Sequence, residues 1–294
     1  MKLFLAAASA FLAIHPAGAA FAQDSGQTRL DGDRQISLGL GIPDSLDFHG
    51  YAGLAVGAFP DYEGSDDIAA MALPLADIRQ PGFLFLKGAS VNPNDGLVSV
   101  GWEALNLGIS KGSIQKLRMS AGPLVHYSGG RDEDDSDTLR GLGDIDDSVG
   151  LGGFIAASGG PWSVDLSVVP QETGDGGGGL LISGGVKHSA QVNDKLAIST
   201  GISTSWGDDD YMQGYYGVTS SQSARSGLAG FDADAGVKDV GVQIGATYEL
   251  SRRWVIEGQA GYQRLLNDAG DSPIVDASGS RDQFRALLGV AYQF

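Results

Sequence analysis

The stretch Gln283–Phe294, QFRALLGVAYQF, decides the fold of this chain. One set of alternate positions is apolar and holds Phe284, Ala286, Leu288, Val290, Tyr292 and Phe294. The other set is mostly polar or small and holds Gln283, Arg285, Leu287, Gly289, Ala291 and Gln293. Because successive side chains of a strand point to opposite faces, this alternation predicts a strand with one apolar face. A tilted strand crosses a bilayer in roughly 9–11 residues. The stretch therefore predicts a transmembrane β-strand that ends on an aromatic residue.

Two further segments repeat the alternation as a hairpin. DVGVQIGATYEL (239–250) and RWVIEGQAGYQR (253–264) flank a tight turn at Ser251 and Arg252. Their aromatic residues fall near the strand ends, where the aromatic girdle of a membrane barrel lies. We assign Trp254, Tyr262 and Trp162 to this interface girdle.

Segments of this kind recur along the chain. We count twelve candidate strands, near 49–59, 68–79, 83–90, 97–109, 115–127, 148–158, 162–170, 179–190, 194–206, 239–250, 253–264 and 283–294. Every second connection is short, whereas the alternate ones are long or acidic, and residues 92–96 fall among the latter. Outer-membrane barrels have short periplasmic turns and longer external loops. The sequence predicts an all-β fold, a transmembrane antiparallel β-barrel of about 12 strands (10–14). A soluble β-sandwich would not require this rhythm.

The amino-terminal part differs from the rest in composition. A short basic head, an apolar run and the tripeptide Ala20-Phe21-Ala22 are typical of a secretory signal peptide. Residues 1–22 are therefore predicted to be a cleaved signal. Residues 23–48 are polar and glycine-rich and are interpreted as a periplasmic lead-in, with the barrel formed by residues 49–294. This organisation predicts an outer-membrane protein of a Gram-negative bacterium.

Composition excludes several classes of protein. The chain has no cysteine, so disulfides and thiolate metal sites are impossible. Its formal net charge of −17 argues against nucleic-acid binding, which requires clustered lysine and arginine. After the signal, no apolar run approaches the roughly 20 residues of a spanning helix.

Motifs for catalysis are not evident. The histidines after the signal, His49, His126 and His188, lie in separate predicted strands, and no G-x-S-x-G nucleophile motif occurs. We therefore expect a non-enzymatic protein without a cofactor or metal site. The acidic run 129–147 has two interpretations, a divalent-cation loop or a solvated external loop, and it lacks the spacing of an EF-hand.

Two groups of residues are candidates for function inside or above the barrel. The inward faces of the last strands supply Glu249, Glu257, Gln259 and Arg285, which predict either a salt-bridged lumen or a polar pore lining. The longest connection, residues 207–238, contains Tyr211, Tyr215 and Tyr216. Long loops in compact proteins are usually functional or disordered. Because the aromatics favour order, these tyrosines are predicted external-loop contacts that fold over or into the barrel mouth.

Several motifs resemble those of one family, and they spread over nearly the whole mature chain. They are PDYEGSDD (60–67), the Gly-Pro pair at 122–123 leading to GLGDID (141–146), the segment 215–228, the hairpin around Trp254 and Tyr262, NDAGDSPIV (267–275) and the terminal YQF. On these motifs the chain is similar to the MipA/OmpV family of Gram-negative outer-membrane proteins. The match is weaker in residues 23–48 and in the second to fourth predicted strands.

The resemblance implies a barrel embedded in outer-membrane lipid and lipopolysaccharide. It also implies that the barrel-assembly machinery reads Phe294, with Tyr292, as its assembly signal. The best-described family role is a scaffold that links a lytic murein transglycosylase to a peptidoglycan synthase. Three hypotheses follow: such a scaffold, a narrow channel for small polar solutes, or a surface adhesin or ligand-binding barrel that acts through its external loops. The resemblance supplies no catalytic residues.

Overall fold

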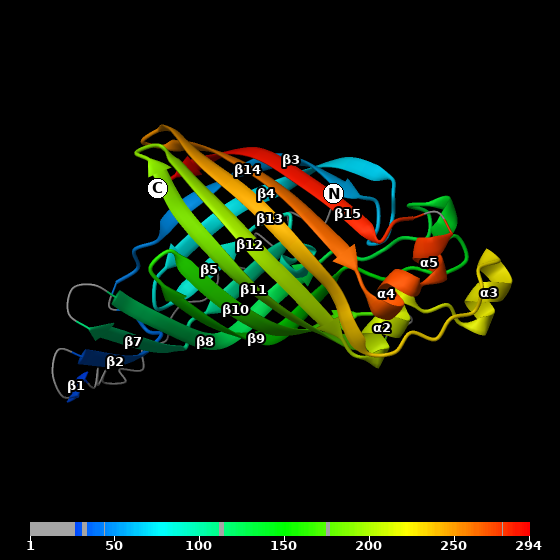
Figure 1. The fold of residues 1–294 in the computed structure, drawn as a ribbon, viewed down its shortest axis with the longest axis horizontal. Coiled ribbons are helices and arrows are strands. Elements are labelled where there is room, and N and C mark those ends of the chain that lie inside the picture. Colours follow the sequence, from blue (N-terminus) through cyan, green and yellow to red (C-terminus); the bar gives the residue numbers. More distant parts are fainter. Residues whose placement is uncertain (1–26, 31–33, 44, 112–114, 175–176, 278) are drawn as a thin grey trace.

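The computed structural model describes residues 27–30, 34–43, 45–111, 115–174, 177–277 and 279–294. The predicted signal peptide, residues 1–22, lies outside the described residues. The chain forms a long barrel of strands, and its short α-helices gather at the end away from the carboxy-terminus (Figure 1).

The strands are β1 (Gln27–Leu30), β2 (Arg34–Leu40), β3 (His49–Pro60), β4 (Ile68–Gln80), β5 (Leu84–Lys87), β6 (Val98–Trp102), β7 (Leu105–Lys111), β8 (Gln115–Ser128), β9 (Ser148–Gly159), β10 (Trp162–Glu172), β11 (Gly178–Asn193), β12 (Leu196–Gly207), β13 (Gly236–Ser251), β14 (Trp254–Leu265) and β15 (Asp282–Gln293). The helices are α2 (Asp209–Tyr216), α3 (Ser220–Ser226), α4 (Asn267–Asp271) and α5 (Pro273–Asp276), with 3-10 turns η2 (Pro93–Asp95) and η3 (Asp137–Leu139).

Twelve of these strands close into an antiparallel barrel. The ring runs β8-β6-β5-β4-β3-β15-β14-β13-β12-β11-β10-β9 and returns to β8 through the β8–β9 pairing. The carboxy-terminal strand β15 lies between β14 and β3, so it joins the last hairpin to the first strand of the barrel. The predicted twelve-stranded barrel is confirmed.

The alternation in β15 has the orientation that a membrane barrel requires. From Gln283 to Ala291 its residues alternate strictly between buried and exposed. The apolar set is exposed on the outside, as Phe284 and Leu288 illustrate, whereas Arg285 and Leu287 are buried on the inside. Lipid has no hydrogen-bonding groups, so the outward face of such a strand must be apolar.

The wall differs from the prediction between residues 83 and 111. The predicted strand 97–109 is divided at residues 103–104 into β6 and β7, which pair with successive halves of β8. Gly122 lies opposite this break, where an added Cβ would approach the Trp102 carbonyl oxygen to 1.8 Å. The predicted strand 83–90 ends at Lys87, because the chain then leaves the wall.

The break in the strand lets a three-stranded branch of the same sheet leave the barrel wall. β6 pairs with β5 and stays in the barrel, whereas β7 pairs with β2, and β2 pairs with β1. We call β1, β2 and β7 the wing; they lie at the end opposite the α-helices (Figure 1). The Trp102 Nε1–H donates to the Gly41 carbonyl at 2.7 Å and fixes the point where the wing joins the wall. The predicted lead-in thus contains strands that sequence periodicity did not reveal.

Candidate functional site

The connection between β5 and β6, residues 88–97, folds into the lumen. The Val91 amide donates to Gln259 Oε1 at 3.3 Å, and the Asn94 side chain donates to the Asp239 carboxylate at 3.3 Å. Gln259 and Asp239 belong to β14 and β13, on the far side of the barrel. The prediction that residues 92–96 form an external connection is wrong. Polar groups of the opposite wall satisfy this segment, so it needs no solvent.

This inward segment separates two chambers of the lumen. The larger chamber, about 320 Å³, lies toward the short turns. The smaller chamber, about 160 Å³, lies under the long connections and is lined by Tyr62, Arg131 and Lys238 among others. Asn94 and His126 line both chambers, so the inward segment is the partition between them. The charged lining residues of the larger chamber are Asp77, Arg79, Lys87, Asp95, Glu103, Arg118, Asp165, Lys187 and Glu257.

A buried lysine organises the wall of the smaller chamber. Lys238 is 1% exposed, and its Nζ lies 2.8 Å from Glu63 and 3.2 Å from Asp239. Gln263 also donates to Glu63, and Arg285 donates to Gln263. Burial alone would raise the pKa of Glu63, but the Lys238 ammonium and the Arg285 guanidinium outweigh it and hold this pKa below its usual range. The network ties the β3–β4 connection to three neighbouring strands.

The predicted lumen residues occupy three different environments. Glu257 and Gln259 line the larger chamber, where Glu257 accepts from Thr247 and from Gln259. Arg285 is buried in the lysine network. Glu249 is exposed with the other residues 248–251 at the end of β13, next to the β13–β14 turn. Lys238 and Asp239 form the centre of the network, although nothing in the sequence distinguished them from a loop boundary.

A packed lid covers the smaller chamber. It consists of α2, α4, α5 and the connection between β8 and β9, and its apolar core includes Met212, Leu265, Ile274 and Leu139. The Asp208 carboxylate caps α2 and also accepts the Leu180 amide, which ties this helix to β11. Gly179 permits the contact, because an added Cβ there would approach the Tyr211 backbone nitrogen to 2.3 Å.

The three predicted loop tyrosines belong to this lid. Tyr211 is 4% exposed and Tyr216 is 1% exposed, and the rings of Tyr211 and Tyr215 stack with centroids 4.6 Å apart. Tyr211 and Tyr215 line the smaller chamber from above. Tyr211 and Tyr216 would contact an external ligand only after the lid had opened, whereas Tyr215 is partly exposed.

The acidic run 129–147 uses much of its charge to cap its own backbone. Glu133 accepts the amides of Gly141 and Gly143, and Asp147 accepts the amide of Gly130. In the described part of the chain, no three His, Cys, Asp or Glu side chains are grouped as metal ligands. The density of carboxylates therefore has a structural explanation in this loop.

The predicted girdle residues lie on the outer surface. Trp254 packs edge-on against Tyr292 with centroids 5.6 Å apart, and Trp162 packs against His188 at 4.6 Å. Tyr262 lies nearer the lid, next to Phe284. The terminal Phe294 exchanges backbone hydrogen bonds with Gly50 and so extends the β15–β3 pairing.

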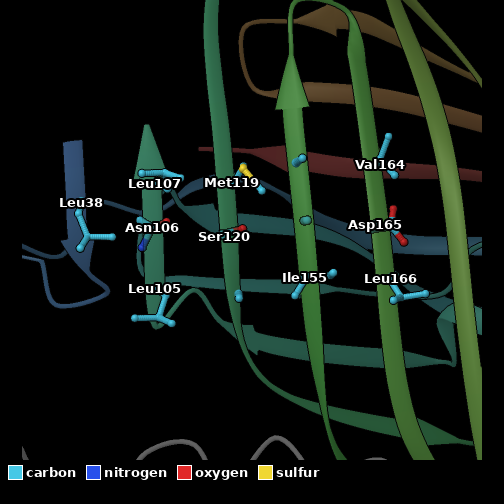
Figure 2. Close-up of a pocket in the computed structure, with 13 residues that line it drawn as sticks. Leu38, Leu105, Asn106, Leu107, Met119, Ser120, Ile155, Val164, Asp165 and Leu166 are labelled. Carbon is cyan, nitrogen blue, oxygen red and sulfur yellow. The ribbon is translucent and has the colours of Figure 1, made fainter. Parts of the chain in front are cut away.

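An apolar groove of about 390 Å³ lies where the wing meets the barrel wall (Figure 2). Strand register aligns Leu38, Leu107, Met119, Ala157 and Val164 in one row across five strands. Alanines at 121 and 157 form its low floor, and larger side chains rise on both sides. The row continues the apolar outer face of the barrel wall onto β2 and β7.

No helix in the described residues is long and apolar enough to span a membrane. Solved structures that resemble this chain include a porin and an outer-membrane protein, both at low sequence identity and low TM-score. NanC porin has 10% identity and a TM-score of 0.43, and the match covers 83% of this chain and all of that one (100%). OmpT of Vibrio cholerae has 11% identity and a TM-score of 0.37, with 92% and 100% covered.

Sequence comparison is more specific. The MltA-interacting protein of Escherichia coli is 35% identical over 105 residues, which are 35% of this chain and 40% of that protein. YiaT of Escherichia coli, whose name describes an outer membrane protein, is 33% identical over 110 residues, 37% of this chain and 42% of that one. The aligned region thus spans less than half of either relative. The profile of the family described as MltA-interacting protein MipA matches residues 52–294. The chain belongs to the MipA family and is an outer-membrane β-barrel.

Proposed function

We propose that this protein is a non-enzymatic scaffold that presents a periplasmic docking surface to a murein-modifying enzyme, a lytic transglycosylase first of all. The wing, which the proposal places on the periplasmic side, is the observation that carries it. A barrel that only had to close would not need β1 and β2, which pair outside the ring. The name of the related MltA-interacting protein supports the class of partner.

The wing has the properties of a docking surface. Within the described residues, β1 pairs along one side only, with β2, so its other edge can receive a strand from a partner. In β2 and in the segment that follows it, Leu38, Leu40 and Leu46 are 57%, 60% and 71% exposed. Leu46 lies in the segment that returns from β2 to β3. Main-chain pairing combined with a neighbouring apolar contact is a common mode of peptide recognition.

A gated channel for small polar solutes is the second candidate. The larger chamber favours it, because its lining is polar and carries both signs of charge. However, the inward segment and the lid lie one above the other in the lumen, so both would have to move before solutes crossed. The scaffold needs no such movement.

Deleting residues 27–40 is expected to weaken binding of the lytic transglycosylase from the same genome at least about tenfold. The deletion removes β1 and β2 but leaves every strand of the closed ring. Biolayer interferometry with the refolded mature protein and the purified enzyme measures the affinity, and heat-modifiable migration verifies the barrel.

The matched control replaces residues 220–226, helix α3, with a Gly-Ser linker. This helix lies at the end opposite the wing and buries none of its residues, so transglycosylase binding should not change. Equal affinity of the wild type and the 27–40 deletion for the enzyme would show that β1 and β2 are not part of the docking surface. Absence of binding by the wild type would overturn the scaffold itself.

A further inference from the structure

Arg131 is a buried cation without an acidic partner. It lies in the connection between β8 and β9 and is 7% exposed. Its Nη1 donates to the Tyr215 carbonyl at 2.7 Å, whereas its Nε is buried and has no partner. Among the ion pairs of the described residues, none includes Arg131. Burial lowers the pKa of Arg131, the direction expected for a cation that no carboxylate compensates.

Local structure directs this side chain inward. Arg131 and Ile145 form a backbone bridge at the base of the acidic loop. Arg131 is buried, whereas its neighbours Asp132, Asp134 and Asp135 are exposed. The loop therefore separates its charges, with carboxylates outside and the guanidinium inside the smaller chamber.

The smaller chamber carries an excess of positive charge. The side chains in its lining that are charged at neutral pH are Glu63, Lys238 and Arg131. Lys238 contacts both oxygens of Glu63, at 2.8 and 2.9 Å, and lies 3.2 Å from Asp239. Arg285 is the second cation of this network, so its two carboxylates are balanced by two cations. Arg131 therefore remains as an uncompensated positive charge in a buried site, where an unpaired ion is costly. A mobile anion in the chamber would compensate that charge.

We propose that the smaller chamber binds one small oxyanion, such as phosphate or sulfate, through the Arg131 guanidinium. A planar guanidinium matches two oxyanion oxygens at once, which a chloride ion cannot reproduce. At about 160 Å³ the chamber is smaller than typical cofactor pockets of roughly 300–1,000 Å³, so the ligand is a small ion. Tyr215 borders the same space. The site is independent of the wing and of the scaffold role.

The test uses the refolded mature protein in detergent. Sodium phosphate or sulfate is titrated at constant ionic strength against sodium chloride, and the midpoint of heat-modifiable migration is followed together with isothermal titration calorimetry. A ligand that binds only the folded state raises the midpoint with concentration. We expect phosphate and sulfate, but not chloride, to raise it, with one ion bound per chain.

Arg131→Gln is expected to weaken oxyanion binding at least tenfold. The matched control is Arg140→Gln in the same loop, because Arg140 is an exposed cation that pairs with Asp137 at 3.0 Å. If Arg131→Gln does not fold, Arg131→Lys provides the test, since it keeps the charge and removes the planar fork. An unchanged affinity in the folded variant overturns the proposal, as does a wild-type protein that responds equally to chloride.

Discussion

Replacing Lys238 by methionine is expected to lower the free energy of unfolding by about 3–5 kcal/mol, because it leaves buried acid groups without their cation. Glu63 and Asp239 both contact the Lys238 ammonium, and Asp239 is fully buried. Methionine fills similar space, so the loss would come from charge and not from packing. Denaturant titration of the refolded barrel, followed by tryptophan fluorescence, measures the change.

The matched control is Lys195→Met. Lys195 lies at the exposed turn between β11 and β12, and its side chain takes part in no ion pair of the described residues. Its replacement should change stability by less than about 0.5 kcal/mol. A loss below about 1 kcal/mol in Lys238→Met would mean that water or other groups compensate the acids.

The same network gives the barrel a defined acid sensitivity. The pKa of Glu63 is lower in the folded state than the ordinary 4.5. Its contribution to stability is therefore complete above pH 4.5 and is lost as the pH falls through the folded-state pKa. Lys238 is the first of the charges that lower this pKa, so Lys238→Met should remove most of this contribution. Unfolding curves between pH 3 and pH 7 should therefore show a difference in stability between the wild type and Lys238→Met that becomes smaller as the pH falls.

The barrel wall was predictable because lipid imposes a simple rule on each strand. Phe284 and Leu288 face out and Arg285 faces in, so the sequence of β15 indicates which of its faces points to the outside of the barrel. Strand count and the short turns follow from repetition of that rule. The alternation specifies which face of a strand points outward but not which strand it pairs with. It therefore could not reveal that β6 and β7 are halves of one interrupted strand.

Features inside the barrel were hidden for a different reason. Residues 88–97 are polar and turn-like, and such a segment has the same composition whether solvent or an opposite wall satisfies it. Arg131 stands beside a run of acids and appeared to be part of their solvated surface. Contacts such as Asn94 with Asp239 join residues 145 positions apart, and no local pattern records them. Glu257 and Gln259 were accessible to prediction because they lie on a regular strand.

The second large effect that we expect concerns ion conductance in planar bilayers, because the inward segment and the lid are two barriers one after the other in the lumen. We expect the wild-type barrel to give no conductance steps, because the inward segment and the lid each block the lumen. In one variant, Asn-Gly replaces residues 89–97, which shortens the connection to a two-residue hairpin next to the Lys87–Ser99 pair. In the other, Asn-Gly replaces residues 208–235, which joins the register partners Gly207 and Gly236 and removes α2 and α3.

Each variant alone should remain silent, and only the double variant should conduct. The reason is that Asn94 and His126 still separate the chambers when residues 208–235 are replaced, whereas Tyr211 and Tyr215 still cover the smaller chamber when the inward segment is shortened. The control variant replaces only helix α3 and keeps the rest of residues 208–235, since that helix buries no residue. Heat-modifiable migration verifies folding of every variant. Steps from the wild type would favour the channel, and steps from one single variant would show that the other barrier does not block ions.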